Sequence, residues 1–159
     1  MKKFDKGGRI LYGTLTLLVL VVIYGQSMLN RQDSAGVSGF AVTYLKPILD
    51  PMDWYTPEAF HHFIRKAGHF TEYFFLGLFF GKFYAVLRKN DGKRNASTPL
   101  LTVLAVAVSD EYLQFFTGRG SMVTDVVLDF SGALCGLLLV SLWGYLLHKR
   151  SITHEAGLQ

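Results

Sequence analysis

Side chains able to do acid-base and ionic chemistry occur inside an apolar stretch of this chain, residues 63–87. Arg65, His69 and then Glu72 or Tyr73 are spaced at i, i+4 and i+7 or i+8, which places them on one face of a helix. Ionisable side chains at membrane depth are costly, so they usually face a protein interior or a water-filled cavity. We therefore interpret this face as one wall of a functional site.

Two later apolar stretches and the connection between them add further polar residues: Asp110, Glu111, Gln114, Arg119, Ser121, Asp125 and Asp129. At a rise of about 1.5 Å per residue, Asp110 lies about 17 Å from the beginning of its stretch. By the same rise, Glu72 lies about 24 Å before Arg88, and Asp129 lies about 30 Å before Lys149. The three polar sets therefore fall in the same half of a bilayer. Gln26, near the end of the first apolar stretch, can reach the same level.

These residue types favour chemistry on an anionic substrate. His69 is the natural general base or nucleophile, and Glu72 or Glu111 would orient it. Asp110 joins them as a catalytic candidate. The candidates for substrate binding are Arg65, Tyr73, Gln114, Arg119 and Ser121. The two arginines would clamp a phosphate through bidentate hydrogen bonds.

The aspartates offer oxygen ligands for a divalent cation such as Ca²⁺, Mg²⁺ or Mn²⁺. We take Asp125 and Asp129, which share a helix face, as the candidate metal ligands, with Asp110 as a third. The same carboxylates can instead pair with the arginines, so the whole set can also be a structural ion-pair network. We interpret Lys66 as an interfacial anchor.

Composition predicts the elements that must position these residues. Half of the chain is hydrophobic and its mean hydropathy is +0.28, which is too apolar for an ordinary soluble domain. Spans of roughly 20 apolar residues cross a bilayer. We expect one all-α membrane domain over residues 1–159, with four transmembrane helices at about residues 10–29, 63–87, 99–116 and 125–147.

Charge and cysteine content limit the function classes. The net charge of +4 comes from basic residues at the N-terminus, in the loop after residue 87 and in the tail, while the loop at residues 30–62 is acidic. This distribution follows the positive-inside rule rather than the needs of a nucleic-acid site. It predicts cytoplasmic N and C termini and a polar cavity in the outer half of the bilayer. A single cysteine, Cys135, excludes an intrachain disulfide.

A small-xxx-small pair, Gly132 and Gly136, predicts that another helix approaches the fourth span closely. That partner can be a helix of the same bundle or of a second copy in a homo-oligomer. Both alternatives stay open from the sequence.

Three segments resemble one family of bacterial membrane proteins: RKAGHFTEYFFLG at 65–77, DEYLQFFTGRGSMVTD at 110–125 and DFSGALCG at 129–136. They resemble the VanZ-like family in order and spacing, over roughly residues 10–147. Asp129 stands where that family often has asparagine. The resemblance implies a multi-pass protein of the bacterial cytoplasmic membrane and an association with glycopeptide (teicoplanin) resistance. A wider grouping with phosphatidylserine synthases of the base-exchange type implies headgroup exchange on a lipid phosphate.

We therefore expect an enzyme that transfers or exchanges headgroups on a membrane lipid, either a phospholipid or a polyprenyl-phosphate, from the extracytoplasmic side. The first alternative is a non-catalytic binder of a lipid-linked cell-wall precursor or a lipoglycopeptide. The second is a proton or ion carrier, which the few polar residues between Gly77 and Leu87 disfavour. A divalent cation is the expected cofactor class, and no nucleic-acid partner is expected.

Overall fold

The computed structural model describes residues 3–29, 39, 42–88, 95–118 and 122–156. These residues form the long helices α1 (Lys3–Ser27), α3 (Pro57–Leu87), α4 (Ser97–Phe116) and α5 (Val123–Ala156), and a short helix over residues 42–49. Each long helix contains a segment long and apolar enough to cross a membrane: Lys6–Ser27, Pro57–Leu87, Ser97–Phe116 and Val123–Leu147. The expected all-α fold with four spans is confirmed.

Helix α3 begins six residues before the expected start of the second span. Thr56 is its N-cap, and its Oγ1 accepts a hydrogen bond from the backbone N–H of Ala59 at 3.3 Å. Pro57 occupies the first turn, where its missing N–H costs nothing, and Glu58 complements the helix dipole there. The added turns carry polar residues that a hydropathy criterion excludes.

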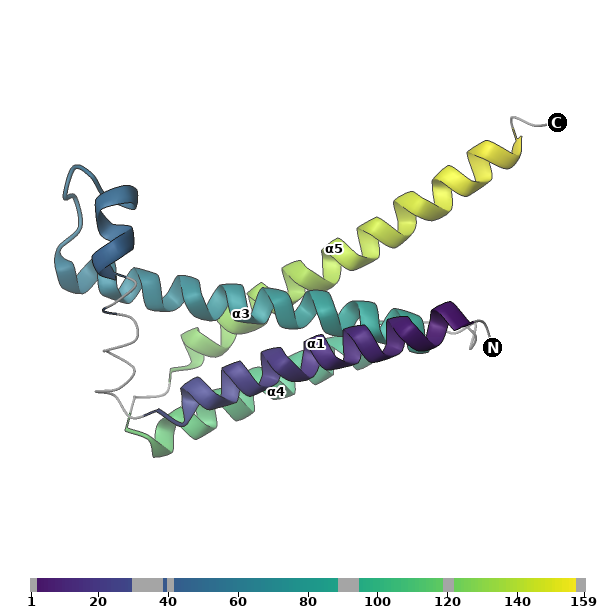
Figure 1. Cartoon of the computed structure of the whole chain (residues 1–159). Coiled ribbons are helices and arrows are strands. Elements are labelled where there is room, and N and C mark those ends of the chain that lie inside the picture. Colours follow the sequence, from purple (N-terminus) through teal and green to yellow (C-terminus); the bar gives the residue numbers. More distant parts are fainter. Residues whose placement is uncertain (1–2, 30–38, 40–41, 89–94, 119–121, 157–159) are drawn as a thin grey trace.

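The helices run alternately up and down, so both ends of the chain lie at the same end of the bundle (Figure 1). Helix α3 has its most extensive contacts with α5 and then with α1. The C-terminal part of α5 extends away from the other helices (Figure 1). The end of the bundle farthest from the termini is therefore the place where all four helices can surround a site. The side of the membrane on which that end lies stays a prediction.

Close contact between α3 and α5 depends on glycines. A Cβ on Gly132 would lie 2.4 Å from the carbonyl oxygen of Phe70, and one on Gly136 would lie 2.3 Å from that of Phe74. A Cβ on Gly77, across the same seam, would lie 2.0 Å from a backbone oxygen of α5. The small-xxx-small pair therefore packs within the bundle. A homo-oligomer built on another surface stays a prediction.

The core beside this seam is apolar. It consists of Ile23, Tyr73, Leu76, Val103, Ala107, Ala133 and Leu137. Many other large apolar side chains of the described residues are exposed, as expected where helices face lipid tails rather than water. Buried polar side chains are concentrated toward the end of the bundle away from the termini.

Candidate functional site

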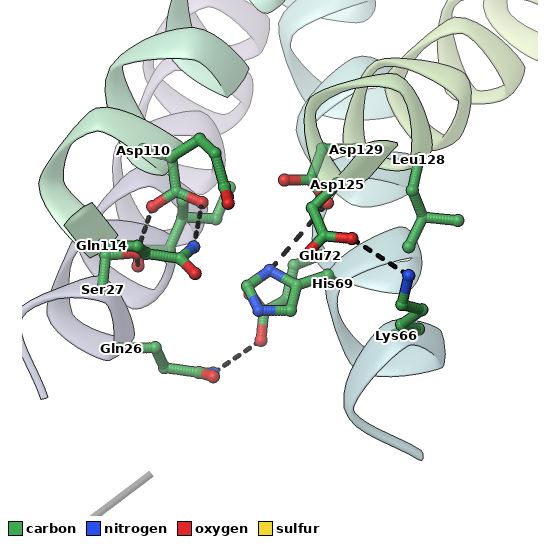
Figure 2. A network of polar contacts seen from close by, with 12 residues as sticks. Gln26, Ser27, Lys66, His69, Glu72, Asp110, Gln114, Asp125, Leu128 and Asp129 are labelled. Carbon is green, nitrogen blue, oxygen red and sulfur yellow. Dashed lines mark hydrogen bonds and ion pairs between the residues drawn. The ribbon is translucent and has the colours of Figure 1, made fainter. Parts of the chain in front are cut away.

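A cluster of polar side chains lies between the four long helices at the end of the bundle away from the termini (Figure 2). Its most buried members come from α1, α4 and α5 and are 0 to 6% exposed: Ser27, Asp110, Glu111, Gln114 and Asp129. His69 and Glu72 of α3 project into the same space (Figure 2). Buried charged groups need partners, so the contacts of each carboxylate indicate its role.

Asp110 is held on both of its oxygens. The hydroxyl of Ser27 at the end of α1 donates to Oδ1, and the side-chain amide of Gln114 donates to Oδ2 at 3.2 Å (Figure 2). Gln114 lies one turn after Asp110 on α4. These two bonds fix the orientation of the carboxylate and leave its remaining lone pairs for a third group.

Asp129 lies opposite His69 across the contact between α5 and α3. The distance from His69 Nδ1 to Asp129 Oδ1 is 3.9 Å, which is too long for a hydrogen bond. The carboxylate is 1% exposed, and neither of its oxygens accepts a hydrogen bond from any residue that the structure describes. A fully buried carboxylate in this condition is costly, which marks it as a functional candidate.

Asp125 is placed differently from Asp129, although both belong to one face of α5. The Nζ of Lys66 donates to Asp125 Oδ1 at 3.0 Å, and both side chains are partly exposed (Figure 2). Lys66 therefore pairs with a carboxylate at the rim of the cluster.

Two glutamates connect the cluster to its supports. The side-chain amide of Gln26 donates to Glu72 Oε1 at 2.5 Å, which ties α1 to α3. Glu111 Oε1 accepts the backbone N–H of Met122 at 2.8 Å, directly before α5. Glu111 therefore holds the beginning of α5 against α4, in addition to any role toward His69.

The cluster encloses a cavity of about 10 Å³, which is room for about one water molecule. Its walls are Arg65, Lys66, His69, Glu111, Gln114, Asp125, Leu128 and Asp129. A larger, open pocket of about 350 Å³ lies beside it, lined by Pro57, Glu58, His61, His62 and Arg65. Arg65 lines both spaces, so a positively charged side chain lies between the open pocket and the small cavity.

Three side chains from different helices have the spacing of a metal site. Ligand atoms of His69, Asp110 and Asp129 all lie within 4.8 Å of one another. Asp110 and Asp129 were candidates for cation binding from the sequence, whereas the structure pairs Asp125 with Lys66.

Most of the expected site residues come together in this cluster. Tyr73 is fully buried beside the apolar core, and its side chain also lies close to Asp110 and Asp129. Arg119 and Ser121, the second phosphate clamp and a substrate-binding candidate, lie outside the described residues.

The sequence interpretation missed Ser27, His61 and His62. Ser27 is the last residue of the apolar helix α1, and nothing in its local sequence distinguishes it. The adjacent histidines lie one turn before Arg65 in the polar first part of α3, at i−4 and i−3. This helical spacing was the available signal.

These features are those of a multi-pass membrane protein with a polar site between its helices. A family model described as VanZ/LLP1 matches residues 12–144, and the chain belongs to that family. Comparison with curated proteins and with solved structures gave no significant match.

Proposed function

We propose that this VanZ/LLP1 family protein transfers or exchanges the headgroup of a membrane lipid phosphate at the outer side of the bacterial cytoplasmic membrane. The main observation that supports the proposal is that Arg65 lines both an open pocket and a small polar cavity. Both lie within a bundle of four helices long enough to cross a membrane. A phospholipid or a polyprenyl-phosphate would bring its phosphate to that residue from the surrounding bilayer.

The open pocket suits an anionic headgroup. Its volume of about 350 Å³ admits a small alcohol and its phosphate, and Arg65 can donate two hydrogen bonds to phosphate oxygens. His61 and His62 provide further nitrogen donors on the same wall. The inner cavity of about 10 Å³ cannot admit a headgroup, so the phosphate would lie at its mouth.

The reaction is a transesterification at phosphorus. The oxygen of an incoming alcohol forms a new P–O bond, the bond from phosphorus to the old headgroup oxygen breaks, and the proton of the attacking hydroxyl ends on that leaving oxygen. A positioned base speeds such a transfer. The two candidates are His69, which lines the cavity, and Glu72, which belongs to the same polar cluster and is held in place by Gln26.

The test uses purified protein in vesicles that contain a labelled phosphatidylglycerol and an excess of serine, ethanolamine or glycerol. Mass spectrometry should detect the exchanged lipid with the wild type. Arg65→Ala should lower the rate by about 100-fold, the usual effect of losing a group that stabilises transition-state charge. Arg88→Ala, a change of the same residue type just past the other end of α3, is the matched control and should keep the rate. Equal product from the wild type and His69→Ala would reject the enzyme.

The open pocket also favours a second candidate, a non-catalytic binder of a lipid-linked cell-wall precursor or a lipoglycopeptide. A binder would lose affinity with Arg65→Ala and tolerate His69→Ala, because only the arginine lines the open pocket. An ion carrier is disfavoured because the core toward the termini is built from apolar residues such as Leu76, Val103 and Leu137.

A link to glycopeptide (teicoplanin) resistance belongs to the same proposal. If headgroup transfer underlies it, expression of the wild type should raise the inhibitory concentration of teicoplanin in a susceptible bacterium. Arg65→Ala should fail to do so at equal membrane abundance. A rise with both proteins would separate resistance from the site.

A further inference from the structure

The strongest unexplained feature of the cluster is the buried Asp129 carboxylate. It is 1% exposed, and neither oxygen accepts a hydrogen bond from the described residues. The electrostatic neighbours that act against its negative charge are themselves carboxylates: Asp110, Glu111, Asp125 and Glu72. Such a group needs a positive partner.

The described residues provide no cation that bonds to Asp129. Arg65 and Lys66 are the cationic side chains on the described wall of the cavity, and Lys66 already pairs with Asp125 at 3.0 Å. The nearest nitrogen in an ion-pair arrangement is His69 Nδ1 at 3.9 Å. That separation is longer than a hydrogen bond and close to the distance between two ligands of one metal ion, which is about 3.4 Å for bonds of about 2.1 Å in tetrahedral geometry.

We propose that His69, Asp110 and Asp129 bind one divalent cation between α3, α4 and α5. Their ligand atoms lie within 4.8 Å of one another, so small side-chain rotations bring all three to bonding distance. The adjoining cavity of about 10 Å³ leaves room for about one water ligand. Ser27 and Gln114 act as outer partners, because they hold both oxygens of Asp110.

The donor set indicates which cation binds. Two carboxylates and one imidazole suit Mn²⁺ or Zn²⁺, whereas Ca²⁺ and Mg²⁺ prefer oxygen ligands alone. The role of the cation rests on the proposed function. The cation would attract the lipid phosphate to the mouth of the cavity, beside Arg65. His69 is then a ligand, and Glu72 is the group that takes the proton.

The test measures metal binding without lipid. Full-length protein, purified in detergent and stripped with chelator, is titrated with Mn²⁺ while electron paramagnetic resonance reports the free ion, and Zn²⁺ is then added as a competitor. We expect one Mn²⁺ per chain, displaced by Zn²⁺. His69→Ala and Asp129→Asn should each weaken binding by more than about 100-fold, since loss of an outer partner alone costs about 10 to 100-fold.

Asp125→Asn is the matched control, because it removes a carboxylate one turn away that lines the same cavity. Its Mn²⁺ affinity should stay within about fivefold of the wild type, because the partly exposed ion pair of Asp125 with Lys66 contributes little energy. Ser27→Ala should weaken Mn²⁺ binding by about 10-fold, because Asp110 loses a hydrogen bond that orients it. If Asp129→Asn does not fold, the Mn²⁺ affinity of Ser27→Ala tests the proposal instead.

Failure of the wild type to bind either ion would overturn the proposal, as would equal losses in Asp125→Asn and Asp129→Asn. Neither result bears on the lipid exchange assay. Conversely, metal binding without headgroup exchange would reject the proposed function and leave the metal site standing.

Discussion

Replacement of Gly132 by alanine tests how the contact between α3 and α5 sets the geometry of the site. The new Cβ would lie 2.4 Å from the carbonyl oxygen of Phe70, whereas carbon and oxygen normally approach to no less than about 3.3 Å. The obstructing atom belongs to a helix backbone, so the two helices must separate by about 1 Å. Phe70 follows His69 in the chain, and Gly132 lies three residues after Asp129.

The magnitude follows from this displacement. Overpacking usually costs about 1 to 3 kcal/mol, and a clash with main-chain atoms belongs at the upper end. About 3 kcal/mol lowers the ratio of folded to unfolded protein by roughly 100-fold. A misplacement of about 1 Å can also cost about 100-fold in rate, so headgroup exchange by the surviving folded protein should fall by a similar factor.

Thermal unfolding in detergent and the exchange rate in vesicles are measured on the same preparations. Gly144→Ala is the control, because it lies on the same helix and a Cβ there meets no atom within 4 Å. Alanine in place of that glycine should be neutral or stabilise the helix by up to about 1 kcal/mol. Equal stability of the two variants would refute the close-contact explanation. A destabilised Gly132→Ala variant with an unchanged exchange rate would refute its link to the site.

Two further predictions concern the support and the orientation of the site. Thr56→Ala should lower the free energy of unfolding by about 1 kcal/mol, because the N–H of Ala59 loses its side-chain cap at the start of α3; an unchanged denaturation midpoint would contradict this role. In a Cys135→Ser background, a membrane-impermeant maleimide should label Asp53→Cys but not Asn95→Cys in intact cells; the reverse pattern would place the site on the cytoplasmic side.

Hydropathy predicted the four spans because each must satisfy its backbone hydrogen bonds internally and expose apolar side chains to lipid. The start of α3 was missed by six residues, since its first turns are polar. Thr56 and Pro57 carry the signal there, a side-chain cap followed by a proline in the first turn. Capping chemistry, rather than hydropathy, sets that boundary.

The polar site was predictable in its residue types and depth, because charged groups inside apolar helices must converge to find partners. The partner of each group was not predictable. Asp125 and Asp129 share a helix face, yet the first pairs with Lys66 and the second faces His69. Which residue of α3 lies opposite each aspartate depends on how α3 and α5 pack against each other, and no local pattern encodes it.

Ser27 illustrates the same limit. A serine at the end of an apolar helix has no distinctive pattern, and its importance arises only when α4 brings Asp110 beside it. The glycine pair of α5 was recognised as a packing surface, but only the structure decides that α3 is its partner.

The most direct measurement of the central claim is isotope exchange into a lipid headgroup. Purified protein in phosphatidylglycerol vesicles is incubated with deuterated glycerol, and mass spectrometry follows label in the lipid, so the reaction needs no net driving force. The account predicts steady incorporation with the wild type and with the control Asp53→Asn, an exposed carboxylate outside both pockets, and a rate about 100-fold lower with Glu72→Gln, as for loss of a general base. Equal incorporation by the wild type and Glu72→Gln would contradict the account. So would a wild type that incorporates no label with any headgroup alcohol, when each labelled alcohol is supplied with vesicles of the lipid that carries the same headgroup.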